Sequence, residues 1–279
     1  MNWPVDHDNN MTKIAIIIPA RYGSTRFEGK PLALINGKAM IDHTVGVARA
    51  AVKDYKNATI LVATDDKRIA DHCTAKGVEV LMTSENCKTG SDRVLEAAIK
   101  LSDEPDIVIN LQGDAPLTPV SALRNVIREF SANPKAQVVT PVQQLAWNDL
   151  DRLRRNKQTT PFSGTTAVVN KHGRALWFSK NILPAIRKED KHRHGGELSP
   201  VYQHLGLYGY KLDILKKFVN WPEGKYEALE GLEQLRFLEN DIPIQCVEIS
   251  ADEVVHSGVD SPEDIPRAEA IMRSRKIAS

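Results

Sequence analysis

The feature that most constrains the fold is the alternation, through the first half of the chain, of short apolar β-rich runs with helical stretches. The β-rich runs are Ile14–Ile18, Thr59–Ala63, Val78–Met82 and Asp106–Leu111. The helical stretches are Met40–Val52, Lys67–Lys76 and Ser91–Leu101. This rhythm is typical of βαβ units, whose strands lie parallel in one sheet. We therefore predict an α/β fold with a mostly parallel sheet flanked by helices.

The second half of the chain is less regular, which favours a smaller mixed α+β lobe. The strand candidates there are Gln137–Val142, Thr165–Val169, Leu205–Tyr210 and Pro243–Ile249, and the helix candidates are Leu229–Glu239 and Pro262–Arg273. The charged, glycine-containing run at 186–200 is interpreted as a mobile surface loop.

Composition limits the class of protein. The chain has 279 residues, 42% of them hydrophobic, which is enough for one large core or one core with a smaller lobe. The net charge of +1 provides no field for wrapping nucleic acid or binding an anionic membrane. The first residues do not read as a secretory signal, and no apolar run approaches a membrane span. Three widely spaced cysteines without paired spacing are interpreted as reduced thiols of a cytoplasmic protein.

The segment Pro19–Leu32 follows the first predicted strand and has the residue types of a phosphate-binding loop. It contains two glycines, two adjacent hydroxyl side chains and three cations, Arg21, Arg26 and Lys30. Glycines let backbone N–H groups approach phosphate oxygens, while Arg and Lys neutralise the charge. An ordinary basic loop is the alternative. The segment matches neither a Walker A sequence nor G-x-G-x-x-G, which argues against a Rossmann dehydrogenase.

Two aspartates are candidates for a ligand site. Asp114 follows the strand ending at Leu111, and ligands of open α/β sheets gather beyond the carboxyl ends of the strands. Asp260 precedes Ser261-Pro262-Glu263-Asp264, which also reads as a capped helix N-terminus. Both interpretations of Asp260 are compatible, because it lies just before the cap.

Taken together, the motifs resemble those of 3-deoxy-manno-octulosonate cytidylyltransferases, also called CMP-Kdo synthetases, from Ile14 to about Met272. The matching runs are Ile-Pro-Ala-Arg-Tyr-Gly-Ser-Thr-Arg and Gly-Lys-Pro-Leu near the start, then Ala63-Thr64-Asp65, Thr89–Arg93, Gln112-Gly113-Asp114, Phe178-Ser179-Lys180, His204–Tyr210, Trp221-Pro222, Leu229–Arg236 and Gly258–Asp264. The resemblance implies a Rossmann-like nucleotidyltransferase sheet and transfer of CMP from CTP to the sugar acid, with release of pyrophosphate.

The resemblance also implies a role for particular residues. Arg21, Lys30 and Asp114 would be catalytic, and Asp114 and Asp260 would bind Mg2+, the implied cofactor. CTP would contact Pro19, Ala20, Arg21, Ser24, Lys30, Thr64, Ser91, Arg93 and Gln112. The sugar acid would contact Gln112, His204, Tyr208, Glu233 and Gln234. Without the resemblance, Arg93 reads as a helix-surface cation, His204 as a structural residue, and Glu230 and Gln234 as neighbours on one solvated helix face.

At the level of organisation, the resemblance implies one nucleotidyltransferase domain. Its parts would be a nucleotide-binding half at about 13–135, a sugar-binding and dimerisation lobe at about 136–250, and a C-terminal metal-ligand segment and helix at about 251–279. The family context implies a homodimer and a cytoplasmic enzyme of lipopolysaccharide biosynthesis, with neither nucleic acid nor membrane as partner.

The chain departs from the family pattern at four positions. Ala115 replaces a glutamate after Asp114, Glu28 replaces a proline, Ala167 replaces a lysine, and Lys180 replaces an arginine. These changes leave two alternatives open beside the sugar acid named above. One is a cytidylyltransferase for a related or amino-substituted sugar acid, and the other is a noncatalytic relative that binds CTP.

Overall fold

The computed structural model describes residues 12–23, 27–250 and 258–277, with side chains through residue 274. The chain folds into two compact units. Among the described residues, the first unit comprises those within 1–124, 209–219 and 257–279, and the second those within 125–208 and 220–256. The segment 209–219 thus belongs to the first unit, although it lies within the stretch assigned by sequence to the sugar-binding lobe.

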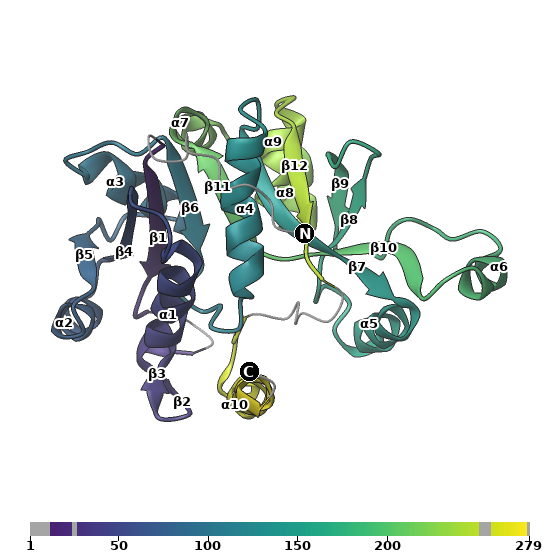
Figure 1. Ribbon diagram of the computed structural model, residues 1–279, viewed down its shortest axis with the longest axis horizontal. Coiled ribbons are helices and arrows are strands. Elements are labelled where there is room, and N and C mark those ends of the chain that lie inside the picture. The colour runs from purple at the N-terminus through teal and green to yellow at the C-terminus, as the bar shows by residue number, and fades with distance from the viewer. Residues whose placement is uncertain (1–11, 24–26, 251–257, 278–279) are drawn as a thin grey trace. The chain divides into compact units, whose positions relative to one another are not determined.

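A parallel sheet forms the centre of the first unit (Figure 1). Its strands, in spatial order, are β5 (Glu79–Met82), β4 (Ala58–Thr64), β1 (Ile14–Ala20) and β6 (Ile107–Leu111), with β11 (Leu207–Lys211) beside β6. β1 runs parallel to both β4 and β6, and every residue of β1 is buried. A run of apolar residues buried on both faces is what a central parallel strand requires. The predicted α/β fold is confirmed.

Helices connect these strands. The first unit contains α1 (Met40–Val52), α2 (Lys67–Ala75), α3 (Gly90–Lys100), α7 (Leu212–Asn220) and α10 (Ile265–Ile277), the 3-10 turns η2 (Lys30–Leu32) and η3 (Pro262–Asp264), and the small hairpin β2 (Leu34–Ile35) and β3 (Lys38–Ala39). Right-handed crossovers put α1 and α2 on one face of the sheet and α3 on the other. Helix α4 (Val120–Ala132) carries the chain from one unit into the next.

The second unit is built around a mixed sheet. Its strands are β7 (Val138–Ala146), β10 (Leu198–His204), β8 (Thr166–Val169) and β9 (Ala175–Ser179), in that spatial order, with β12 (Ile244–Glu248) paired to β7. β12 runs parallel to β7, while the β7–β10, β10–β8 and β8–β9 pairs are antiparallel. Its helices are α5 (Trp147–Thr159), α6 (Glu189–His194), α8 (Lys225–Glu230) and α9 (Leu235–Glu239). The predicted mixed lobe is present.

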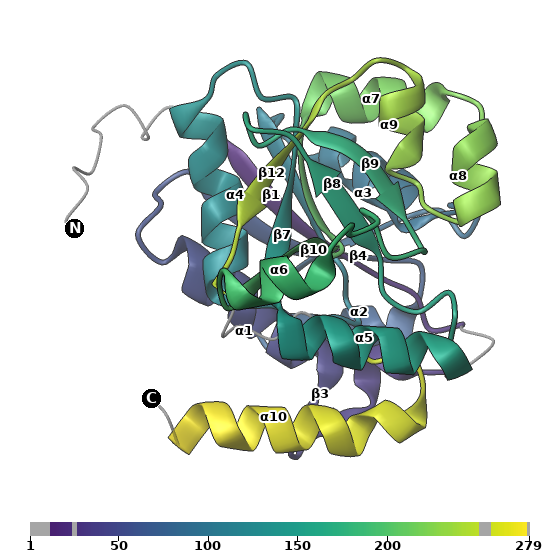
Figure 2. The ribbon, with the colours of Figure 1, turned by 90° about the vertical axis from the view of Figure 1, so that its right-hand side faces the viewer.

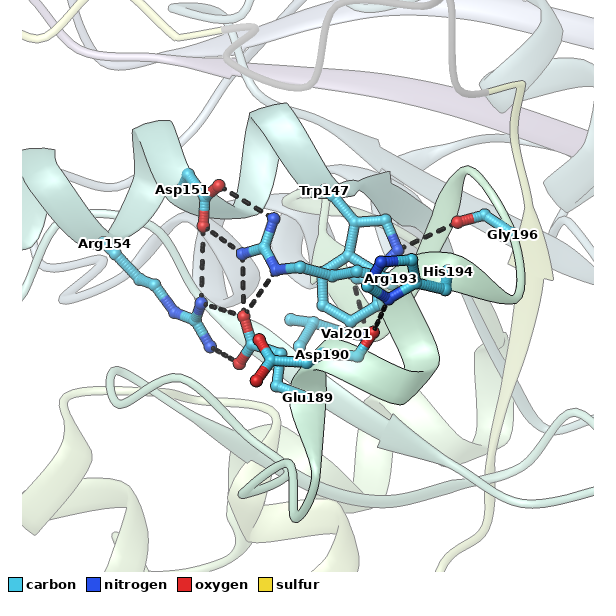
Figure 3. A network of polar contacts seen from close by, with 10 residues as sticks. Trp147, Asp151, Arg154, Glu189, Asp190, Arg193, His194, Gly196 and Val201 are labelled. Carbon is cyan, nitrogen blue, oxygen red and sulfur yellow. Dashed lines mark hydrogen bonds and ion pairs between the residues drawn. The ribbon is translucent and has the colours of Figure 1, made fainter.

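The interpretation of 186–200 as a loop is wrong. This segment contains α6 and the beginning of β10, and α6 lies beside α5 (Figure 2). Arg154 binds Glu189 through two contacts of 2.8 Å, and Arg193 binds both Glu189 and Asp151 (Figure 3). The two guanidinium groups lower the pKa of Glu189 to about 2. The charged residues therefore fasten α6 to α5, a pairing that the local sequence does not reveal.

The predicted single helix over Leu229–Glu239 is also wrong. Helix α8 ends at Glu230, Gly231 adopts a left-handed conformation with φ of 61°, and α9 begins after Gln234. Glu230 and Gln234 therefore do not share a helix face. The C-terminal prediction is correct in kind, since η3 and α10 cover Pro262–Ile277.

Candidate active site

The loop after β1 is folded back on itself by a tyrosine and a glycine. The backbone N–H of Gly29 donates to the carbonyl oxygen of Tyr22 at 2.9 Å. A Cβ atom on Gly29 would lie 2.9 Å from the Tyr22 ring, and the φ of Gly29 is 66°, so only glycine fits without strain. This turn sets Arg21, whose side chain is exposed, at the end of β1, and begins η2 with Lys30. Ser24 lies outside the described residues.

Lys30 and Asp114 meet at the carboxyl end of the sheet. Lys30 Nζ lies 2.5 Å from Asp114 Oδ2, and the lysine side chain is only 13% exposed. Asp114 is brought there by a close approach of backbones, because a Cβ on Gly113 would lie 2.8 Å from the carbonyl oxygen of Pro19. The glycine of Gln112-Gly113-Asp114 is therefore required by packing. Two of the three predicted catalytic residues are in contact.

The C-terminal segment reaches the same place. The Val259 N–H donates to the backbone oxygen of Asp114 at 2.9 Å, so the residue next to Val259, the exposed Asp260, is held near Asp114. The N–H groups of Asp260 and Ser261 donate to the carboxylate of Asp264, at 2.9 and 3.1 Å. The capping interpretation of this segment is confirmed. The acceptor of the cap is the carboxylate of Asp264, and Asp260 takes part only through its backbone N–H.

This pair of carboxylates fits a magnesium ion that also binds phosphate. Within the described residues no cluster of three or more His, Cys, Asp or Glu side chains is arranged to hold a metal ion. Mg2+ does not need such a cluster, because it keeps several waters and is usually bound by one or two carboxylates together with substrate phosphates. The donor set of Asp114 and Asp260 has that composition, and the two residues come from segments joined by a hydrogen bond.

The remaining nucleotide candidates of the first unit line the ends of the same strands. Pro19 and Ala20 end β1, Thr64 ends β4, and Gln112 follows β6. A Cβ on Gly90, the first residue of α3, would lie 3.5 Å from Gln112 and 3.7 Å from Pro19, so the start of α3 adjoins this edge. Ser91, the next residue, is 3% exposed.

Arg93 has a different environment from the surface position that its sequence context favours. The residue is 3% exposed, and its guanidinium lies 2.5 Å from both Asp65 Oδ2 and Thr83 Oγ1. The interpretation as a helix-surface cation is wrong. Arg93 ties α3 to the segments that follow β4 and β5, and its direct contact with a nucleotide stays a prediction.

In the second unit, His204 is buried among polar and aromatic side chains. Its Nε2 lies 2.8 Å from Thr140 Oγ1 on β7. The ring contacts Phe178 edge-on, with centroids 5.1 Å apart, and lies 5.3 Å from the ring of Tyr208. Burial and, to a smaller extent, the charge of Lys180 lower the pKa of His204 to about 3, so the imidazole is neutral at neutral pH.

Glu233 and Gln234 lie in the turn between α8 and α9. Gln234 is 5% exposed, and its Nε2 is buried without a hydrogen-bond partner among the described residues. An unsatisfied buried amide costs about 1–3 kcal/mol and is the kind of group that a ligand hydroxyl satisfies. The unsatisfied Nε2 supports the prediction that Gln234 binds a sugar.

Carboxylates that the sequence analysis did not select hold this turn. Glu227 of α8 accepts two hydrogen bonds from Arg236 of α9, at 2.5 and 2.7 Å, and both side chains are nearly buried. Glu230 accepts from Ser179 Oγ at 2.7 Å and from the Lys180 N–H at 2.8 Å. Sequence spacing gives no signal for the second set of contacts, because it joins residues about 50 positions apart.

Two departures from the family pattern fall on buried positions. Ala167 is fully buried between Phe178 on β9 and Tyr202 on β10, and Ala115 is 6% exposed in the turn after Asp114. Glu28, by contrast, is exposed, and its charge acts on Arg68, whose guanidinium stacks 3.3 Å from the centroid of the Tyr22 ring. The added acid in the loop is therefore close to a cation of the same unit.

Comparison with known proteins shows the family. A profile described as Cytidylyltransferase matches residues 15–248. The 3-deoxy-manno-octulosonate cytidylyltransferase of Maricaulis maris is 44% identical over 93% of this chain and 96% of its own length. The protein of the same name from Zea mays is 39% identical over 94% of this chain and 81% of its own length.

Solved structures show the same relationship. CMP:2-keto-3-deoxy-manno-octonic acid synthetase complexed with CTP is 32% identical, with a TM-score of 0.80, over 95% of this chain and all of that one. The 4-diphosphocytidyl-2C-methyl-D-erythritol synthase of Anaerococcus prevotii, 13% identical with a TM-score of 0.57 over 94% of this chain and 99% of that one, shares the fold. None of the described helices is long and apolar enough to span a bilayer. The chain belongs to the cytidylyltransferases, in the family of the 3-deoxy-manno-octulosonate cytidylyltransferases.

Proposed function

We propose that this enzyme transfers CMP from CTP to 3-deoxy-manno-octulosonate, forming CMP-Kdo and pyrophosphate. Family membership and the CTP complex of a similar structure support the reaction. The structural observation that carries the proposal is the meeting of Lys30, Asp114 and the 258–260 segment at the carboxyl edge of the first unit's sheet. A lysine paired with one carboxylate, with a second carboxylate on the adjoining segment, suits a magnesium-bound triphosphate.

In the proposed reaction the anomeric hydroxyl oxygen of the sugar acid attacks the α-phosphorus of CTP, and the hydroxyl proton passes to solvent. The bond from that phosphorus to the bridging oxygen of pyrophosphate breaks, and pyrophosphate leaves. Arg21 and Lys30 neutralise the triphosphate and stabilise the charge that develops on the leaving group. Asp114 and Asp260 would hold Mg2+, which when bound would neutralise phosphate charge and orient the α-phosphate for in-line attack. The protein supplies mainly positioning and electrostatics.

The second unit carries the proposed sugar-acid contacts other than Gln112. Gln234 Nε2 is a donor for a sugar hydroxyl, because it is buried without a partner in the described part of the chain. Glu233 beside it provides an acceptor, and neutral His204 and Tyr208 provide further polar contacts. A ligand that satisfies the buried amide recovers the free energy that this amide costs in the unliganded enzyme.

A related or amino-substituted sugar acid is the second candidate acceptor. Ala115 and Ala167 each remove a charged side chain relative to the family pattern, and both alanines are buried. The alternative predicts that a second sugar acid is used at least as well as 3-deoxy-manno-octulosonate, with CTP still required.

Pyrophosphate release by the purified full-length chain tests the proposal. Each of the four NTPs is supplied with Mg2+ or with EDTA, and with 3-deoxy-manno-octulosonate, its 8-amino analogue, a sialate or no acceptor. The proposal requires release only when CTP, Mg2+ and 3-deoxy-manno-octulosonate are all present. Release with another acid alone would favour the second candidate, and CTP binding without release with any acid would indicate a noncatalytic relative.

Three further features stay proposals: a homodimer, a cytoplasmic location, and a role in supplying the activated sugar for lipopolysaccharide. They follow from the family context. Sedimentation equilibrium tests the dimer, fractionation of the source cells tests the location, and analysis of lipopolysaccharide after depletion of the protein tests the role.

A further inference from the structure

Thr140 makes an unusual set of contacts for a threonine in a sheet. Its Oγ1 lies 2.8 Å from His204 Nε2, 2.8 Å from the carbonyl oxygen of Leu207, and 3.4 Å from that of Leu205. Thr140 and Leu207 are almost completely buried, and His204 is 9% exposed. At 2.8 Å these groups contact one another directly, so each hydrogen bond among them must use one of their own protons.

Counting protons assigns the tautomer of His204. A threonine hydroxyl has one hydrogen, and a carbonyl oxygen can only accept. If the hydroxyl donates to the oxygen of Leu207, then Oγ1 must accept from Nε2, and Nε2 carries the imidazole proton. In the opposite arrangement the hydroxyl would donate to Nε2, and Oγ1 and the Leu207 carbonyl oxygen would lie 2.8 Å apart with no hydrogen between them, which is repulsive.

The other ring nitrogen then has a defined character. Because the imidazole is neutral and its proton is on Nε2, Nδ1 presents a lone pair. Nδ1 makes no hydrogen bond to any residue in the described ranges. The edge of Phe178 and the ring of Tyr208 pack against the imidazole and restrict its rotation.

We propose that Thr140 is a positioning residue, which holds His204 with its proton on Nε2 so that Nδ1 accepts a hydrogen bond from a hydroxyl of the sugar acid. This inference rests on the proposed function for the identity of the ligand. It adds a residue of β7 to the sugar-acid site and gives His204 the role of a hydrogen-bond acceptor. His204 then takes no proton and gives none during the reaction.

The first test is the tautomer itself, measured by 15N NMR of the imidazole nitrogens in the free full-length enzyme, with His204→Gln used to assign the signals. We expect a protonated Nε2 and an unprotonated Nδ1. In Thr140→Val, which removes the hydroxyl and nearly conserves volume, we expect a mixture of tautomers. Thr140→Ser, which keeps the hydroxyl, should preserve the wild-type pattern.

The second test is steady-state kinetics with CTP and 3-deoxy-manno-octulosonate. Thr140→Val should raise KM for the sugar acid about tenfold, the scale of one well-placed hydrogen bond, and leave KM for CTP unchanged. Thr140→Ser should restore the wild-type KM. The matched control is Thr166→Val, which removes another buried hydroxyl of the second unit, one that donates to the Asn181 carbonyl at 2.6 Å without contacting His204. This control should change neither the tautomer nor KM.

The outcomes separate this inference from the proposed function. The inference would be overturned if the enzyme used the sugar acid while His204 carried its proton on Nδ1. It would also be overturned if KM for the sugar acid were unchanged in Thr140→Val, or if that KM rose equally in Thr140→Ser. An enzyme without activity toward any sugar acid would refute the proposed function, and with it the ligand contact, while the NMR result would still decide how Thr140 sets the tautomer.

Discussion

Replacing Arg236 by methionine should destabilise the second unit by about 3 kcal/mol. The residue is the last of the run Leu229–Arg236 that resembles the family pattern, and its guanidinium pairs with Glu227, which is 4% exposed. Removing one partner of a buried ion pair costs about 3–5 kcal/mol, because the other charge stays buried without compensation. The lower end applies here, since Glu227 keeps a hydrogen bond of 2.9 Å from the Gly224 N–H.

Urea unfolding followed by tryptophan fluorescence measures this loss. Trp147, Trp177 and Trp221 all belong to the second unit, so the signal reports mainly on it. The control Arg152→Met breaks an ion pair of the same unit whose arginine is 63% exposed, and it should cost less than about 0.5 kcal/mol.

A double variant provides the decisive comparison. In Glu227→Leu/Arg236→Met no charge is left buried, so the loss should shrink to about 1 kcal/mol, the cost of removing the cap on Gly224. A double variant at least as unstable as Arg236→Met alone would refute the argument from burial. So would a loss below about 1 kcal/mol in Arg236→Met.

Three other predictions follow from the site. Asp114→Asn should leave the fold intact but reduce pyrophosphate release at least about 100-fold, the scale of losing one preorganised electrostatic contact, whereas Asp71→Asn on the surface should keep full activity. Gly113→Ala should lower the free energy of unfolding by about 1–3 kcal/mol, because the added methyl would meet the backbone oxygen of Pro19 at 2.8 Å. The control Gly46→Ala, whose methyl would enter open space, should not lower it. Equal urea midpoints for the two variants would contradict this reasoning. The pKa of His204 is about 3 in the folded enzyme and near 6.5 in the unfolded chain, so its contribution to the free energy of unfolding is complete above pH 6.5 and declines as the pH falls toward 3. Between pH 7.5 and pH 5, the free energy of unfolding should therefore fall by about 2 kcal/mol more in the wild type than in His204→Gln. Parallel pH profiles of the two proteins would argue against a neutral buried imidazole.

Local patterns predicted the first unit well because its elements depend on local signals. The helix Met40–Val52 was placed at its observed bounds, and β1 differs from its prediction by two residues at one end. An apolar run buried on both faces and a helix with one apolar stripe leave clear periodicities.

The second unit was predicted less completely, because its elements depend on distant contacts. Strand β10 is missing from the predictions since it buries polar residues, Ser199 and Gln203, which disguise its alternation. Helix α5 is missing because only Trp147, Leu150 and Leu153 of its residues are buried. The break between α8 and α9 depends on Gly231 and on a buried ion pair across the turn, and neither has a periodic signature.

Within the candidate site, motif resemblance selected residues that the structure brings together, notably Lys30 and Asp114. Motif resemblance did not select the residues that hold the candidate side chains of the second unit in place. Thr140 and Glu230 pair with side chains 64 and 51 positions away, and Glu227 pairs with Arg236 across the break between α8 and α9. Such pairing is visible only once the chain is folded.

The interleaving of the two units along the chain has a consequence for biosynthesis. When the ribosome has released only the first 124 residues, strand β6 still lacks its neighbour β11, and the apolar cluster containing Ile35, Met40 and Leu117 still lacks Val259 and Ala268. An unpaired strand edge and an uncovered apolar surface both invite aggregation. The nascent enzyme must keep the sheet edge protected until β11 is translated, and the apolar cluster until Ala268 is. Truncation near the C-terminus should therefore be far more damaging to its yield in cells than the small size of the missing piece implies.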